Sequence, residues 1–344
     1  MTLLLLVVGS LIFLVVLSFG VEALRQRPTA PTTLYWAPKI PIQTTVIGGN
    51  TIRYIKTGKG PPLVLLHTLR TQLDIFEKLL PLLSKSFTVY ALDYPGHGFS
   101  DIPETDYDPD LFVRTVEEFL DKLDLEDVTL AGISIGGVIP LIVAAKHNPR
   151  VKKVIAINPY DYAHGMGIAR GNGWSWLTFN LAKVPVLGET VMRLRNRFIE
   201  KRILQGGVAN PEAITPGFGE QVRASGFRPG HYRAFPNLLH HAHMWDDARQ
   251  RYGEINLPVL VIYGDQDWSR QEERRRTVQA IPGATVETVA HGGHFLSLDR
   301  PERLAELVKS FTSAQASQAT KLSPDDRVYD QPKWHQHSRY KRPW

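Results

Sequence analysis

The fold of this chain is decided by Val128-Thr-Leu-Ala-Gly-Ile-Ser-Ile-Gly-Gly137. Its first residues form an apolar run that predicts a short buried strand, and residues 138–146 predict a helix. Between them lies Gly-Ile-Ser-Ile-Gly, which is the pattern G-x-S-x-G. A serine on such a sharp turn exposes its hydroxyl above a sheet, and the helix N-terminus behind it suits a developing negative charge. The stretch therefore indicates Ser134 as a nucleophile. The alternative is a small structural serine in a glycine-rich turn. The motifs further along the chain decide between the two interpretations.

The composition is that of a globular protein of 344 residues, long enough for one large domain or a domain with an insertion. Cysteine is absent, which excludes disulfides and cysteine-based metal or redox chemistry. The net charge is +6, and residues 321–344 hold six Lys or Arg against three Asp. No motif typical of nucleic-acid binding is present, so we expect no nucleic-acid partner.

The N-terminal residues 2–23 carry one charge, Glu22, and are otherwise almost wholly apolar. This length is enough to span a bilayer. A cleaved signal sequence is the alternative, but it needs a basic leading segment and a small-x-small cleavage site, and neither is seen. We therefore predict a single-pass transmembrane anchor. Arg25, Arg27 and Lys39 follow it, which places the catalytic domain on the cytoplasmic side. Residues 24–42 contain several prolines and predict a linker.

Strands alternate with helices over residues 43–159 and again over residues 257–312. This alternation predicts a mostly parallel sheet of eight strands, flanked by helices and joined by right-handed crossovers. It stops over residues 160–256, where we see helical segments but no clear strand. A loop of that length is uncommon, so we predict a helical cap inserted after the sixth strand. Residues 313–344 are polar and irregular and predict a disordered basic tail.

An acid that could orient a catalytic base follows the predicted strand 258–263, in Gly264-Asp-Gln-Asp267. A carboxylate at the end of a parallel strand faces the same crevice as Ser134. We favour Asp267, because it lies past the turn and can point over the sheet edge. Asp265 better suits a turn or a helix cap. Asp161, which follows the preceding strand, is a weaker rival.

The base follows the last predicted strand, in His291-Gly-Gly-His-Phe295. Glycines let this loop bring an imidazole across to the serine. His294 is favoured over His291 because it follows both glycines. The resulting order along the chain is serine, aspartate, histidine.

With these motifs in place, the chain resembles the α/β-hydrolase superfamily from about residue 44 to residue 311. Three further stretches carry the resemblance: Leu65-Leu-His67, Asp93-Tyr-Pro-Gly-His-Gly-Phe-Ser100 and Asp299-Arg-Pro-Glu302. The resemblance implies an α/β-hydrolase fold with Ser134 as nucleophile, Asp267 as triad acid and His294 as base. It also implies an oxyanion hole made by the backbone N–H groups of Ile135 and Leu69. We expect no cofactor.

One departure concerns the oxyanion loop, where the superfamily usually has glycine and this chain has Thr68. Threonine resists backbone conformations that glycine allows, so the loop is expected to have a different shape. Arg70 follows directly, and it either contacts a substrate carboxylate or is simply solvated. Trp268, next to Asp267, is a further candidate for substrate binding.

The predicted cap carries two clusters of titratable side chains. His240, His241 and His243 lie on one expected helix, but adjacent histidines on a helix point about 100° apart, so we predict no metal site. Residues 190–202 predict a basic amphipathic helix. Its basic face is either solvated or lies on anionic lipid.

The identity of residue 134 at the turn restricts which reactions of the superfamily we expect. Relatives that resemble haloalkane dehalogenases and epoxide hydrolases use aspartate there, so Ser134 argues against both. We predict a membrane-anchored serine hydrolase that cleaves an ester-like bond. A lipophilic carboxylic ester, either a small molecule or a lipid, is favoured because an anchored domain meets membrane-dissolved molecules at high effective concentration. The alternatives are a thioester or carbon–carbon bond hydrolase and a non-hydrolytic ligand-binding member of the same fold.

Overall fold

The computed structural model describes residues 1–313 of the chain, so the predicted tail lies outside the described residues apart from Ser313. The described part is built on a single sheet with the strand order β1-β2-β3-β5-β4-β6-β7-β8-β9. The bounds of the strands are β1 Thr33–Leu34, β2 Ala37–Ile47, β3 Asn50–Thr57, β4 Pro62–Leu66, β5 Thr88–Leu92, β6 Val128–Ile133, β7 Val151–Ile157, β8 Val259–Gly264 and β9 Thr285–Val289.

The sheet is mostly parallel, as predicted, but it has nine strands rather than eight. Strands β1 to β3 and the β3–β5 pair are antiparallel, and the neighbours from β5 to β9 are parallel. The additional strand is β1, which pairs with the start of β2. Part of the predicted linker therefore belongs to the sheet. Pro38 and Pro41 fit there because a strand near the sheet edge tolerates a missing N–H donor.

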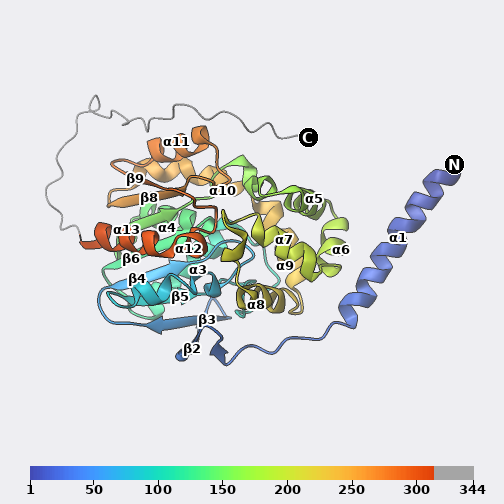
Figure 1. The fold of residues 1–344 in the computed structure, drawn as a ribbon, viewed down its shortest axis with the longest axis horizontal. Helices are drawn as coiled ribbons and strands as arrows, with labels where there is room; N and C mark the ends of the chain where they lie inside the picture. Colours follow the sequence, from blue (N-terminus) through green and yellow to red (C-terminus); the bar gives the residue numbers. More distant parts are fainter. Residues whose placement is uncertain (314–344) are drawn as a thin grey trace. The chain divides into compact units, whose positions relative to one another are not determined.

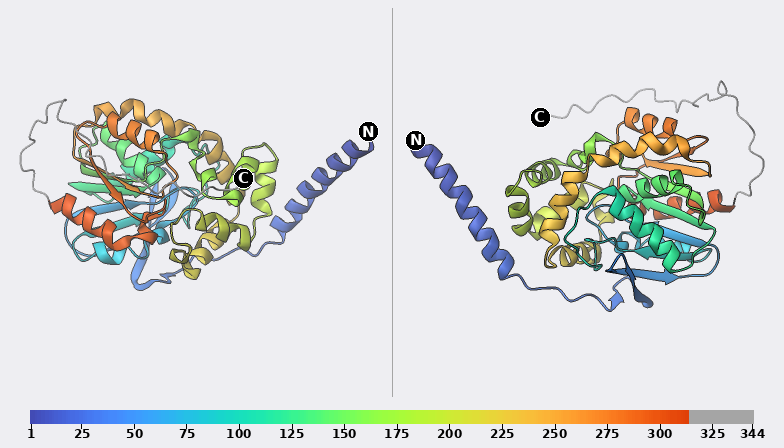
Figure 2. Two further views of the ribbon diagram at one scale, coloured as in Figure 1. Left: turned by 45° about the horizontal axis from the view of Figure 1, so that its top comes forward. Right: turned by 180° about the vertical axis from the view of Figure 1, so that it is seen from behind.

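Helices cover both faces of the sheet in Figure 1 and Figure 2. They are α2 (Leu80–Leu83), α3 (Pro109–Lys122), α4 (Ile135–Ala145), α11 (Gln271–Ala280), α12 (Leu296–Asp299) and α13 (Pro301–Ser313). Helix α3 shows how its sequence sets its position. The Asp108 carboxylate accepts a hydrogen bond from Leu111 N at 2.9 Å and fixes the helix start. Phe112, Val116 and Phe119 then recur at helical spacing and are buried against the core.

A group of helices lies between β7 and β8, where the sequence predicts the cap. They are α5 (Gly173–Ala182), α6 (Leu187–Arg193), α7 (Arg197–Gln205), α8 (Pro216–Gly226), α9 (His231–His241) and α10 (Met244–Asp247). Helices α5 to α9 gather at one end of the sheet in Figure 1. Asn172, Asn196 and Thr215 cap the starts of α5, α7 and α8 with their side-chain oxygens.

The N-terminal segment forms helix α1 (Thr2–Ala23). The prediction of a transmembrane anchor is nevertheless wrong: within residues 1–313, no helix is both long and apolar enough to cross a membrane. The predicted single-pass topology with a cytoplasmic catalytic domain falls with it. The last turn of α1 contacts the cap instead. The Glu22 carboxylate lies 3.3 Å from Arg195, and the Arg193 guanidinium lies 3.9 Å from the centre of the Phe19 ring.

The basic segment 190–202 is also not the single amphipathic helix that the sequence predicts. Helix α6 ends at Arg193, and α7 begins at Arg197 after the capping residue Asn196. Arg193 and Arg195 are only 2% and 8% exposed. These two arginines therefore face the protein interior and not a lipid surface.

Candidate active site

Ser134 lies on the turn between β6 and α4. Its backbone has φ 65° and ψ −123°, a strained conformation for a residue with a side chain. The neighbouring glycines are required by close approach. A Cβ on Gly132 would lie 1.9 Å from Gly136 O, and a Cβ on Gly136 would lie 2.2 Å from Leu66 O. The spacing G-x-S-x-G thus has a steric cause, as expected for a nucleophile turn.

The backbone of Ser134 is held on both sides of the turn. Its N–H donates to Ile157 O at 2.9 Å, and its carbonyl accepts from Tyr160 N at 3.2 Å. The Ser134 hydroxyl is fully buried, yet its Oγ has no hydrogen-bond partner within the described residues. A buried polar atom without a partner is uncommon and is typical of a functional site.

His294 lies on the loop between β9 and α12, and its imidazole contacts Asp267 at the end of β8. The distance from Nδ1 to the Asp267 Oδ1 atom is 2.5 Å. The other carboxylate oxygen accepts from the backbone N–H of Ser269 at 2.9 Å and from the Ser269 hydroxyl. Burial alone would raise the pKa of Asp267, but His294 and the bonds from Ser269 lower this pKa below its usual value. With Nδ1–H donated to the carboxylate, the His294 Nε2 atom can accept a proton, and it has no partner among the described residues.

The three alternative candidates for the acid and the base make other contacts. The Asp265 Oδ1 atom accepts from Gly292 N at 3.1 Å, the turn role that the sequence suggests for it. Asp161 is fully buried and accepts from the Thr277 hydroxyl at 2.8 Å. His291 is exposed, and its carbonyl accepts from Arg300 Nε at 3.0 Å.

Asp161 should give the protein a pH-dependent stability. Burial raises the pKa of its carboxyl to about 7, although Arg249 and Thr277 oppose the shift. The folded state therefore keeps a proton that the unfolded chain releases near pH 4, and stability should fall as pH rises from about 4 to 7. Asp161→Asn keeps an acceptor for Thr277 and should flatten this decline. Thermal denaturation midpoints of the wild type and of Asp161→Asn, measured over this pH range, test the prediction. Midpoints that fall equally with pH in both proteins would count against it.

The loop that the sequence predicts to form the oxyanion hole follows β4. The backbone N–H groups of Leu69 and Ile135 donate to no protein acceptor in residues 1–313. His67 is held by two bonds: its Nδ1–H donates to Thr68 O at 2.7 Å, and its Nε2 accepts from Tyr94 N at 3.2 Å. Burial lowers the pKa of His67 well below its usual value, so the ring is neutral and fixes the loop.

Thr68 is not the strained position of this loop. Thr68 is not among the residues with positive φ, whereas Arg70 has φ 55°. The Thr68 carbonyl accepts from the Thr71 hydroxyl at 2.9 Å, which closes the loop into a turn. The left-handed position of this loop is therefore Arg70, two residues after Thr68.

Arg70 is not solvated, because its side chain is only 11% exposed. Its Nη2 atom lies 3.3 Å from Glu200 Oε1, and its guanidinium lies 5.0 Å from the centre of the Phe235 ring. Arg70, Leu69 and Glu200 line a cavity between the core and the cap. Most of the remaining lining is apolar: Ile168, Phe179, Ile203, Leu204, Val222 and Phe295.

Trp268 stacks on His294 and is not among the residues that line this cavity. The two ring centres are 3.8 Å apart and the planes are inclined by 14°. The indole Nε1–H donates to Gly206 O at 2.8 Å, which ties the ring to the cap. Trp268 therefore supports the imidazole, a role that the sequence did not reveal.

Trp268→Leu should lower kcat about tenfold, because an aromatic pair is worth about 0.5–1.5 kcal/mol and its loss lets the imidazole tilt. KM should change little, since Trp268 does not line the cavity. Trp268→Phe keeps a stacking ring and should recover most of the rate. Steady-state kinetics on one ester test this. A rise in KM at constant kcat would assign Trp268 to substrate binding instead.

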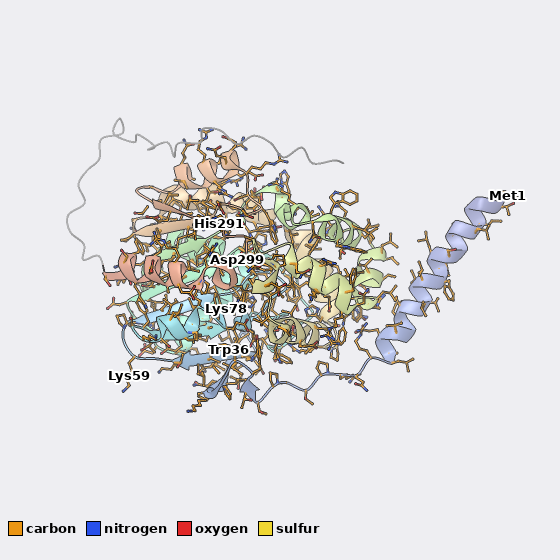
Figure 3. All side chains as sticks on the ribbon, in the orientation of Figure 1. Met1, Trp36, Lys59, Lys78, His291 and Asp299 are labelled. Carbon is orange, nitrogen blue, oxygen red and sulfur yellow. The ribbon has the colours of Figure 1, made fainter. Side chains whose placement is uncertain are left out.

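Two core side chains tie the cap to the His294 loop and to the helix α12 that follows it, and both are labelled in Figure 3. The Asp299 carboxylate accepts from Gly293 N and from Ala209 N, each at 2.8 Å. Lys78 donates to Ala213 O at 3.0 Å and to Leu298 O at 3.2 Å. The sequence marked Asp299 only as part of a motif, and nothing in it pointed to Lys78.

No cluster of three or more His, Cys, Asp or Glu side chains that could hold a metal is found in the described part of the chain. The His240 and His241 rings lie edge to face, with their centres 5.2 Å apart.

The sheet order and the helices on both of its faces are those of an α/β-hydrolase fold. The chain belongs to the alpha/beta hydrolase family, whose family model matches residues 63–307. It is 25% identical to haloalkane dehalogenase 2 of Mycobacterium tuberculosis over 271 residues, which are 75% of this chain and 90% of that protein. It is 26% identical to 2-(acetamidomethylene)succinate hydrolase of Mesorhizobium japonicum over 281 residues, 78% of this chain and 94% of the other. The crystal structure of Cfl2 from Burkholderia cenocepacia is similar with a TM-score of 0.71 at 22% identity, covering 83% of this chain and 99% of that one.

Proposed function

We propose that this protein is a serine hydrolase that cleaves a carboxylic ester, with Ser134 as nucleophile, His294 as base and Asp267 as the acid that orients it. The proposal rests on one arrangement of side chains. A strained turn holds a buried serine hydroxyl that has no partner within the described residues. A histidine bonded to a buried carboxylate keeps its Nε2 available for that hydroxyl's proton.

In this mechanism Ser134 Oγ attacks the acyl carbon while His294 Nε2 takes its proton. The Ile135 and Leu69 N–H groups donate to the oxyanion that forms. The alcohol leaves with the proton from His294, and water then hydrolyses the acyl-enzyme by the same steps. The described residues include no hydrogen bond between Ser134 and His294. Such bonds often tighten only when substrate is bound.

Dehalogenation, the reaction named for one relative, does not suit a serine. Attack of the Ser134 oxygen on an alkyl halide would form an alkyl ether. An ether has no carbonyl carbon for water to attack, so the enzyme would stop after one turnover. An acyl group on Ser134 keeps its carbonyl and can be released.

The apolar lining of the cavity beside Leu69 supports a lipophilic acyl group. Glu200 neutralises the one cation beside Leu69, so the wall there offers little to a charged substrate. The case for a lipophilic ester thus rests on the apolar cavity and not on a membrane anchor.

A serine-reactive fluorophosphonate probe tests the nucleophile. It should label the wild-type protein and fail to label Ser134→Ala. His294→Ala should also lose labelling, whereas His291→Ala should keep it, because His291 is exposed and does not contact Asp267. Labelling that persists in Ser134→Ala would contradict the proposal.

A panel of p-nitrophenyl esters of increasing chain length tests the substrate class. We expect turnover to rise from acetate to medium-length chains as the acyl group fills the cavity. A matched thioester and amide complete the panel. Faster turnover of the thioester than of the ester would move the protein to the thioesterase alternative, and a preference for acetate would contradict the lipophilic acyl group.

A further inference from the structure

The cap contains a second cavity, between α5, α6 and α7. Most of its lining is apolar and includes Trp174, Leu177, Leu181, Val191, Leu194 and Ile199. Trp174 and Leu177 are 40% and 44% exposed, so the cavity reaches the surface along α5. The wall is suited to a hydrocarbon chain.

Arg195 also lines this cavity and has donors that no protein group uses. Its side chain is 3% exposed. The Nη1 atom donates to Met192 O and lies 3.3 Å from Glu22, but Nε and Nη2 have no partner among the described residues. Buried guanidinium N–H groups without an acceptor are costly, so these two donors indicate a ligand with acceptor oxygens.

The charges around the cavity leave one positive charge in excess. Arg70 and Glu200, which also line it, pair with each other at 3.3 Å. Glu22 is shared between Arg195 and Arg25, at 3.3 Å and 3.0 Å. These three arginines and two carboxylates carry one net positive charge, although Arg25 and Glu22 do not line the cavity themselves. Burial lowers the pKa of Arg195 to about 10, and Arg25 and Arg70 add to this effect, but the guanidinium stays charged at neutral pH.

We propose that the cap cavity binds an amphiphilic monocarboxylate, with the carboxylate on Arg195 and the apolar chain along α5 and α7. A single negative charge matches the single excess positive charge. A dianionic phosphate monoester would leave a buried charge without compensation. An uncharged alcohol would leave the Arg195 cation unpaired.

This cavity shares Arg70, Glu200 and Ile203 with the cavity beside Leu69. Arg70, Glu200 and Ile203 thus separate the two cavities. An amphiphilic carboxylic acid is what a lipophilic ester releases on hydrolysis, which suggests that the cap cavity receives the product. This last link rests on the proposed function, whereas the binding itself does not.

The experiment is isothermal titration of dodecanoate into the full chain carrying Ser134→Ala, so that turnover plays no part. Dodecanoate should bind one to one, and dodecanol should bind about tenfold more weakly or worse, as expected for loss of a buried charge pair. Arg195→Met should weaken dodecanoate binding about tenfold or more and leave dodecanol binding unchanged. Glu200→Gln removes the competing carboxylate and should tighten dodecanoate binding. Arg197→Met is the matched control, because the Arg197 side chain is 75% exposed and should have no effect.

Several results would overturn the proposal: equal affinities for acid and alcohol, tighter binding of dodecyl phosphate than of dodecanoate, or no change in Arg195→Met. If Arg195→Met fails to fold, Leu181→Trp replaces it, since a larger ring should fill the cavity and abolish binding of both ligands. Unaltered dodecanoate binding in Leu181→Trp would place the ligand elsewhere. Because Ser134 is absent from every variant, a failure to bind leaves the proposed hydrolase untouched, and successful binding does not depend on it.

Discussion

Ser134→Ala is expected to lower kcat for a p-nitrophenyl ester by about 10⁶-fold, because the members of a triad act as a unit and loss of the nucleophile removes the covalent route. The residual rate over water should come from the two backbone N–H donors and from binding in the cavity. KM should change little. Steady-state kinetics on one medium-chain ester, with the wild type measured in parallel, provide the test.

The same variant should fold as well as the wild type or better. The Ser134 Oγ atom is buried without a partner in the described residues, so alanine removes an unsatisfied polar atom and breaks no hydrogen bond. An unchanged or higher denaturation midpoint would thus separate loss of chemistry from loss of structure. A variant that keeps more than about a hundredth of the wild-type rate would exclude Ser134 as the nucleophile.

The sheet was largely predictable because its strands carry their own signal. β4, β6 and β8 are apolar runs buried on both faces, which is typical of parallel strands in the middle of a sheet. β1 escaped prediction because two residues have no period to detect. The start of β2 was interpreted as linker because prolines usually exclude a strand, but the antiparallel edge accepts them.

The geometry of the site depends on contacts between distant parts of the chain, which a sequence pattern does not contain. Arg70 meets Glu200 130 residues later, and Trp268 meets Gly206 62 residues earlier. The basic residues of 190–202 looked like a solvated or lipid-facing stripe, yet Arg195 is buried because α1 brings Glu22 to it. The apolar composition of residues 2–23 likewise predicted a membrane span, but no described helix qualifies as one. The sequence order of Ser134, Asp267 and His294 was visible at once because each follows a strand of recognisable type.

Asp267→Asn should lower kcat about 10⁴-fold, because an amide cannot hold the imidazole in the tautomer that leaves Nε2 ready to accept the serine proton. The carboxylate lies 2.5 Å from His294 Nδ1 and has a lowered pKa, so it is ionised and able to stabilise an imidazolium. The asparagine amide nitrogen only donates, so where it faces Nδ1 it takes up the Nδ1 lone pair. The ring proton then lies on Nε2, which can no longer accept the proton of Ser134.

Two matched variants decide whether this loss is specific. Asp265→Asn alters only a turn bond to Gly292 N and should cost less than about tenfold in kcat, as expected for one modest hydrogen bond. Asp161→Asn should leave kcat nearly unchanged, since Asp161 pairs with Thr277 and Arg249. If Asp265→Asn proved the more damaging change, the Asp267–His294 bond would not be the one that catalysis uses. If Asp161→Asn alone lost activity, the acid would belong to the preceding strand, and the contact between Asp267 and His294 would serve only to hold the loop.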